Sequence, residues 1–130
     1  MTTATKLLAI ALAGALGTLA RYGLAGLVQR KLPAWAAAFP FGTAIVNIIG
    51  CFFFGLLWSA LTQRWSISPE LRAAILVGFM GAFTTFSTYI FESRQLLADS
   101  EWILAFANLT GQILIGLAAL LTGMALGKAL

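Results

Sequence analysis

The chain has 130 residues and a net charge of +4, with 61% hydrophobic and only 9% charged residues. Soluble domains carry roughly 25% charged residues, so this chain has too little charge to cover a water-facing surface. The composition excludes an ordinary soluble domain and predicts one apolar domain, residues 1–130, that is solvated by lipid. The sequence has no His and only four acidic residues, which also argues against an enzyme.

The basic residues and the lone cysteine fit this class. The eight Lys and Arg residues are scattered between apolar segments, which is typical of anchors to lipid headgroups and not of a nucleic-acid-binding patch. Cys51 stands alone in an apolar run, so the sequence has no disulfide framework and no cysteine-based metal site. We therefore expect lipid, and no nucleic acid, as a partner.

Four apolar segments predict four membrane-spanning helices, because each exceeds the roughly 20 residues that a helix needs to cross the hydrocarbon core. The first can also be read as a signal peptide with Lys6 as its charged region, although its length and Arg21 favour a span. Ser68 and Pro69 predict the N-cap and first residue of the third helix. Thirteen glycines predict close helix packing and an oligomer. The predicted spans are residues 5–28, 41–63, 71–97 and 102–127.

Polar residues inside the first two spans are informative, because each must find a partner or line a cavity. Arg21 is such a residue in the first span, and Thr43 and Asn47 lie one turn apart in the second. An amide in a membrane helix can simply bond a neighbouring helix. The same pair can also present an O–H and two N–H donors to a polar path on one face of the helix.

The third span contains the sequence GFMGAFTTFSTY at residues 78–89, where glycines and hydroxyl residues are concentrated. These residues weaken a helix, so we expect a break in mid-membrane, around Gly81 to Thr84. Broken backbone at membrane depth must be buried or line a polar cavity, and its released carbonyls can coordinate a small cation. The alternative is that the hydroxyls bond back to the preceding turn and the helix only bends.

Aromatic and amide side chains complete the pattern. Phe83, Phe86 and Tyr89 recur every three residues and are expected to form one stripe, whose ring edges carry positive partial charge. Asn108 and Gln112, one turn apart in the fourth span, add further donors. The spans contain no circle of Lys or Arg side chains that could line a pore. The pattern therefore indicates a path on which neutral hydrogen-bond donors replace the water molecules around an anion.

Residues 81–88, GAFTTFST, resemble the G-G-x-T-T-F-S-T signature of the Fluc (CrcB) family of fluoride channels. The resemblance implies a fluoride-selective channel in the bacterial inner membrane, which exports cytoplasmic fluoride passively and lowers its toxicity. It also implies a dual-topology antiparallel homodimer with two pores and a central structural sodium ion. The similarity covers all four spans, with further matches at residues 40–43, Val46–Asn47, Gly50, Gly17 and Arg21–Tyr22.

The resemblance implies roles for single residues as well. Asn47 matches the pore asparagine, Phe86 matches the first pore phenylalanine, and the main-chain carbonyls of Gly81 and Thr84 match ligands of the sodium ion. Tyr89 stands where the family has its second pore phenylalanine, and Gln112 stands where it often has Ser, so the detailed pore lining stays open. The other matches are polar-track hydroxyls at Thr43, Ser87 and Thr88, and vestibule or gating residues at Arg21, Glu92 and, by position, Gln112.

Two other classes of protein fit a chain of this kind. A small multidrug-type exporter also has four helices and is dimeric, but it needs an acidic residue in the first span, and residues 5–28 contain none. A non-transporting membrane subunit would use its polar residues only to join helices. The lack of an acidic residue at the membrane centre favours a passive channel over a coupled exchanger.

Positive charge is nearly balanced across the predicted membrane. Orientation follows the excess of Lys and Arg close to the ends of the spans. The side of the N-terminus has four such residues and the opposite side has three, a difference of one, so both orientations are predicted. The four are Lys6, Arg64, Arg72 and Lys128, and the three are Arg30, Lys31 and Arg94.

Overall fold

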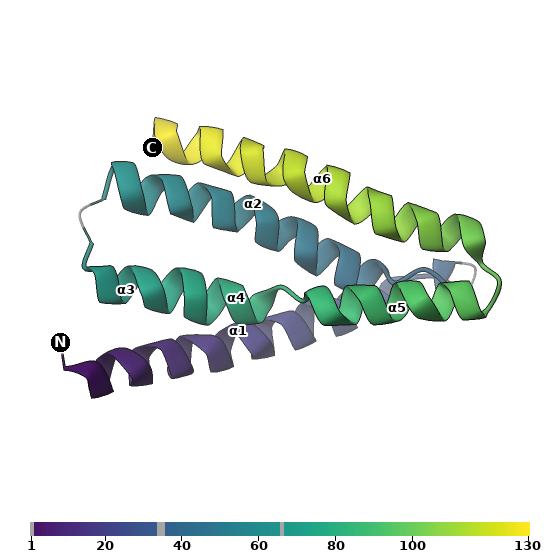
Figure 1. Cartoon of the computed structure of the whole chain (residues 1–130), viewed down its shortest axis with the longest axis horizontal. Helices are drawn as coiled ribbons and strands as arrows, with labels where there is room; N and C mark the ends of the chain where they lie inside the picture. Colours follow the sequence, from purple (N-terminus) through teal and green to yellow (C-terminus); the bar gives the residue numbers. More distant parts are fainter. Residues whose placement is uncertain (1, 34–35, 66) are drawn as a thin grey trace.

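The structure is a computed structural model that describes residues 2–33, 36–65 and 67–130. In these residues all regular structure is helical, and four helical stretches are long and apolar enough to cross a membrane. Both chain ends lie at the same end of the bundle (Figure 1), as an even number of crossings requires. The chain is therefore an all-α, multi-pass membrane protein. Its spans are α1 (Thr3–Lys31), α2 (Phe41–Gln63), an interrupted third span (Pro69–Ala98) and α6 (Trp102–Ala129).

Each predicted span lies within an observed one, and α1 is an integral part of the bundle. Gly17 of α1 is buried where a Cβ would overlap the carbonyl oxygen of Phe79 in the third span. The third span begins as predicted, because the Ser68 hydroxyl oxygen accepts the Leu71 N–H at 3.2 Å and Pro69 follows as the first helical residue. Its pieces are α3 (Pro69–Ala73), the π-helix η2 (Ala74–Met80), α4 (Gly81–Phe83) and α5 (Phe86–Ala98).

The third span is interrupted at Thr84 and Thr85, where the chain bends before the helix resumes (Figure 1). Both residues are extended, with φ and ψ of −89° and 158° at Thr84 and −146° and 114° at Thr85. The Thr84 hydroxyl donates back to the Met80 carbonyl oxygen at 3.2 Å, while Thr85 Oγ1 caps α5 by accepting the Thr88 N–H at 3.3 Å. The predicted break is confirmed at the C-terminal edge of the expected interval, and back-bonding of a hydroxyl forms part of it.

The apolar core lies between α2 and the first half of the third span. Val46, Met80 and Phe83 are buried at its centre, and the ring of Phe83 stacks on that of Phe79 with centroids 6.0 Å apart. Phe86, on the other side of the break, is 75% exposed. The prediction of a single aromatic stripe is therefore wrong, because two extended residues separate Phe83 from Phe86 and change the direction of the chain.

Glycines allow α2 and α6 to approach closely. A Cβ at Gly55 would overlap the Leu120 carbonyl oxygen, and one at Gly123 would overlap the Phe52 carbonyl oxygen. Small residues have this role in lipid, where close backbone packing replaces the hydrophobic drive between helices. The packing holds α2 in place and so sets the position of the polar residues that α2 and α6 carry inward.

Candidate functional site

The centre of the site is the side chain of Asn47, which bonds to both backbone groups of Thr85 at the break. The Thr85 N–H donates to Asn47 Oδ1 at 2.9 Å, and Asn47 Nδ2 donates to the Thr85 carbonyl oxygen at 3.2 Å. These bonds replace helical partners that the extended backbone has lost, and buried backbone groups need such partners. A side chain on α2 therefore stabilises the broken backbone of the third span.

The break also leaves several carbonyl oxygens without their helical donors, among them those of Gly81 and Thr84. In a continuous helix the Thr85 N–H would bond to the Gly81 oxygen, and the Thr88 N–H would bond to the Thr84 oxygen. Here the first N–H donates to Asn47 and the second to Thr85 Oγ1. Among the described residues no hydrogen bond reaches the carbonyl oxygen of Gly81 or Thr84. Hard cations such as sodium favour oxygen ligands of this kind.

Side chains alone do not build a metal site in the part of the chain that the structure describes, because no group of three or more His, Cys, Asp or Glu residues comes together there. The neighbouring Ala82 carbonyl oxygen accepts a hydrogen bond from Arg21 Nε at 3.1 Å. Arg21 thus donates to one carbonyl oxygen at the break, that of Ala82, and not to the carbonyl oxygens of Gly81 and Thr84. The residues present fit a cation held by main-chain oxygens, which is the arrangement that the family resemblance implies.

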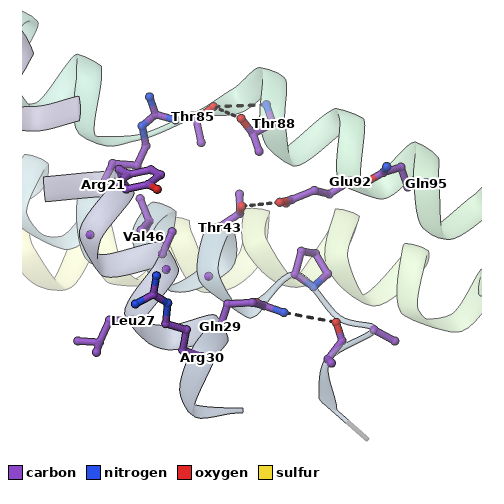
Figure 2. A pocket seen from close by; sticks show the side chains of 18 of the residues that line it. Arg21, Leu27, Gln29, Arg30, Thr43, Val46, Thr85, Thr88, Glu92 and Gln95 are labelled. Carbon is purple, nitrogen blue, oxygen red and sulfur yellow. Dashed lines mark hydrogen bonds between the residues drawn. The ribbon is translucent and has the colours of Figure 1, made fainter. Parts of the chain in front are cut away.

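A cavity of about 1010 Å³, here called the vestibule, is lined by polar, charged and apolar residues beside the break (Figure 2). Figure 2 shows the Thr43 hydroxyl from α2 and the Glu92 carboxylate from α5 pointing toward each other, and the O–H donates to Glu92 Oε1 at 2.8 Å. Glu92 Oε2 is buried and has no partner among the described residues. Arg21, Thr85 and Thr88 also line the vestibule.

A second hollow of about 400 Å³, here called the groove, lies on the other side of the break and is more apolar. Its wall includes Asn47, Phe86 and Tyr89, and the rings of the last two have centroids 5.7 Å apart. Gln112 lines the groove beside Asn47, whose Nδ2 donates to Gln112 Oε1 at 2.8 Å. Thr85 lines both hollows, so the break lies between them.

The residues singled out from the sequence divide between these hollows. Gln112 lies in the groove and not in the vestibule, and exposed Ser87 lines neither hollow. Thr85 and Ser93 were not among the predicted site residues, although the spacing of Thr85 and Thr88 is that of a helix cap. The vestibule takes Arg21, Thr43, Thr88 and Glu92, while the groove takes Asn47, Thr84, Phe86, Tyr89 and Gln112.

The hydroxyl of Tyr89 points away from the groove. It donates to the Leu109 carbonyl oxygen of α6 at 2.8 Å, and the side chain is only 4% exposed. We therefore expect Tyr89→Phe to leave ion flux unchanged, since the ring edge stays in place, while one α5–α6 hydrogen bond worth about 1 kcal/mol is lost. Flux from proteoliposomes and the thermal stability of the purified protein measure the two effects.

Exposed Tyr22→Phe is the matched control, because its 79% exposed side chain makes no comparable buried bond. A Tyr89→Phe protein that folds but no longer conducts would place the hydroxyl among the donors that the ion uses.

These features define a class: a membrane-spanning protein in which a broken helix, held by an amide of a neighbouring helix, lies between two hollows that carry polar side chains. The chain belongs to the family described as "CrcB-like protein, Camphor Resistance (CrcB)", whose model matches residues 8–124.

Relatives in several bacteria resemble it over almost the whole chain. A protein of Solidesulfovibrio magneticus named "Fluoride-specific ion channel FluC" is 57% identical over 123 residues, covering 95% of this chain and 96% of the relative. Proteins of the same name from Desulforapulum autotrophicum and Nitrosococcus oceani are 53% and 51% identical, each with 95% of this chain and 96% of the relative covered.

Proposed function

We propose that the chain is a fluoride-specific ion channel and not an enzyme, and that it lets cytoplasmic fluoride leave the cell passively through the bacterial inner membrane. Relatives up to 57% identical over nearly the whole chain carry this name. The observation that carries the proposal is the position of Thr85, which lines both hollows and is bonded to Asn47 on α2. A polar path through the membrane therefore passes the break.

The chemistry along this path suits a small, strongly hydrated anion. Arg21 and Arg30 line the vestibule together with the acidic residues Glu92 and Asp99, so the two guanidinium groups offer an anion local sites in a cavity of mixed charge. Beyond Thr85 the ion meets neutral donors and the rings of Phe86 and Tyr89, whose positive edges stabilise an anion without a fixed counter-charge. Weak, neutral sites of this kind allow an ion to leave as well as enter, which conduction requires.

The proposed assembly is an antiparallel homodimer. The groove is open, and Phe86 at its edge is 75% exposed within one copy. A partner of the same sequence would cover this ring and close the groove into a pore. The near balance of positive charge on the two sides of the membrane allows copies of opposite orientation to be present together.

The proposed structural cation is sodium, held by the carbonyl oxygens of Gly81 and Thr84 from both copies. Their lost helical partners and the position of the break support this. We expect the purified protein to unfold at a lower temperature when sodium is replaced by N-methylglucamine, because the facing carbonyls then lack a counter-charge. Equal stability in both salts at matched ionic strength would count against a structural sodium ion.

Fluoride efflux from liposomes tests the function directly. The purified protein is reconstituted with internal potassium fluoride, and valinomycin then allows charge balance, so a passive channel gives rapid efflux seen with a fluoride electrode. Fluoride/proton exchange also moves net charge, so a coupled exporter is recognised by fluoride efflux that an imposed proton gradient drives, and a non-transporting subunit gives no efflux. Potassium chloride in place of the fluoride salt is the selectivity control, and we expect little chloride release. Phe86→Ile should reduce fluoride efflux through loss of the ring edge.

A further inference from the structure

Three amides and one hydroxyl form a continuous row of hydrogen bonds across α2, α6 and α5, here called the amide relay (Asn47, Gln112, Asn108 and Ser93). Asn47 Nδ2 donates to Gln112 Oε1 at 2.8 Å, and Gln112 Nε2 donates to Asn108 Oδ1 at 2.7 Å. Asn108 Nδ2 then donates to Ser93 Oγ at 2.9 Å. The bonds all run in one direction, and neither hollow contains Asn108 or Ser93.

The two ends of the relay determine this direction. At one end Asn47 Oδ1 accepts the Thr85 N–H at 2.9 Å, and a backbone N–H can only donate. At the other end Ser93 Oγ donates to the Tyr89 carbonyl oxygen at 2.8 Å, and a carbonyl can only accept. Turning over any one amide would set two donors or two acceptors against each other. Backbone groups of α5 and its N-cap thus determine which way every amide faces.

Burial makes such a mismatch costly at the far end of the relay. Asn108 is fully buried and Ser93 is 2% exposed, so water cannot replace a lost partner there. Hydrogen bonds in a row also polarise one another, so each strengthens its neighbours. The near end is different, because Asn47 and Gln112 line the groove and can be reached by an ion.

We infer that Gln112, Asn108 and Ser93 are positioning residues, which act together with the Thr85 backbone to hold Asn47 so that Nδ2, and not Oδ1, faces an anion in the groove. The inference rests on the proposed channel function. Gln112 Oε1 occupies the acceptor position on Asn47 Nδ2, and a fluoride ion that displaces this oxygen meets an N–H donor. With the amide reversed, the ion would meet an oxygen and be repelled.

The test cuts the relay at Ser93, which lies outside both hollows. In Ser93→Ala the Asn108 amide loses its acceptor, so the three amides are oriented from the Thr85 end alone. We expect fluoride efflux to fall by about tenfold, the change typical of a single buried donor left without a partner. We also expect the side-chain NH₂ signals of Asn47 to shift in NMR spectra of protein labelled with ¹⁵N at Asn and Gln.

Matched variants separate the relay from general damage. Thr122→Ala removes a hydroxyl that likewise bonds to a backbone carbonyl, of Ala118 at 2.8 Å, but lies on an exposed face and belongs to no relay. It should leave both efflux and the Asn47 signals unchanged. Ser93→Thr keeps a hydroxyl and should restore both. Should Ser93→Ala not fold, Gln112→Met cuts the relay at a half-exposed position, and the same loss of efflux is expected.

A folded Ser93→Ala protein with wild-type efflux, or with unchanged Asn47 signals, would overturn the inference. The effect of Ser93 on Asn47 must also be transmitted through the amides of Asn108 and Gln112. In a Gln112→Met background, Ser93→Ala should shift the Asn108 signals but not those of Asn47, and a shift at Asn47 would indicate a path other than the relay. The NMR measurement does not depend on transport. If the wild type shows no fluoride efflux, the proposed function is overturned, but the NMR spectra still test whether the relay positions Asn47.

Discussion

Replacing Asn47 by Ala should reduce fluoride efflux by about 100-fold or more, because two partly buried hydrogen-bonding contacts are lost and each is worth roughly a factor of ten. One loss is the donor that we place beside the ion. The other is the pair of bonds to Thr85, at 2.9 and 3.2 Å, that stabilise the broken backbone. The expected result is a protein that still elutes like the wild type but neither conducts nor holds the break in place.

Asn47→Asp separates these two losses. A carboxylate can still accept the Thr85 N–H, so the break keeps one of its bonds, but it has no donors for the ion and adds a repelling charge. We expect thermal stability nearer to wild type than that of Asn47→Ala, and equally low efflux.

The control for both variants is Thr62→Ala, which removes an exposed polar side chain from the same helix. Efflux in liposomes and the elution volume of the purified protein are the measurements. Wild-type efflux in either well-folded Asn47 variant would remove Asn47 from the proposed pore.

Three lysines added after Leu130 should force one orientation in the membrane and abolish most of the fluoride export. The wild-type difference of one positive charge between the two sides would become four, and orientation follows this excess. If the working unit pairs opposite orientations, a population with a single orientation cannot assemble it. Fluoride sensitivity of cells that lack their own exporter measures the loss, and a reporter fused to the C-terminus measures the orientation.

Co-expression with an oppositely biased partner should restore export. That partner carries three lysines in the loop between Lys31 and Phe41, on the other side of the membrane from the C-terminus (Figure 1). Neither variant should protect cells alone. Protection by either single variant, or a wild-type reporter that reads only one side, would contradict the antiparallel assembly.

The sequence predicted the membrane class and the boundaries of the spans closely, because both depend on local properties. Apolar length determines whether a helix can cross the bilayer, and Ser68 with Pro69 begins the third span by a local cap. The break near Thr84 was also predictable, since glycine and hydroxyl residues weaken a helix wherever they are concentrated. Family resemblance and spacing together predicted Asn47 and Phe86 as site residues, and both line the groove.

Other features depend on contacts between residues far apart in the sequence. The predicted aromatic stripe was wrong because a helical repeat does not continue across two extended residues, so Phe83 is buried and Phe86 exposed. The sequence showed Asn108 and Gln112 as two donors, but not that Gln112 lies in the groove or that Asn108 is bonded to Ser93.

By itself the sequence determined that this chain crosses a membrane four times, where its third helix breaks and which residues are polar at depth, because hydrophobicity and helix propensity act over a few neighbouring residues. Only the tertiary structure decided which backbone groups Asn47 holds, which carbonyls are left free and which way each amide faces. These properties depend on hydrogen-bond partners supplied by other helices, and the register between α2, α5 and α6 is set by close packing such as that at Gly55 and Gly123.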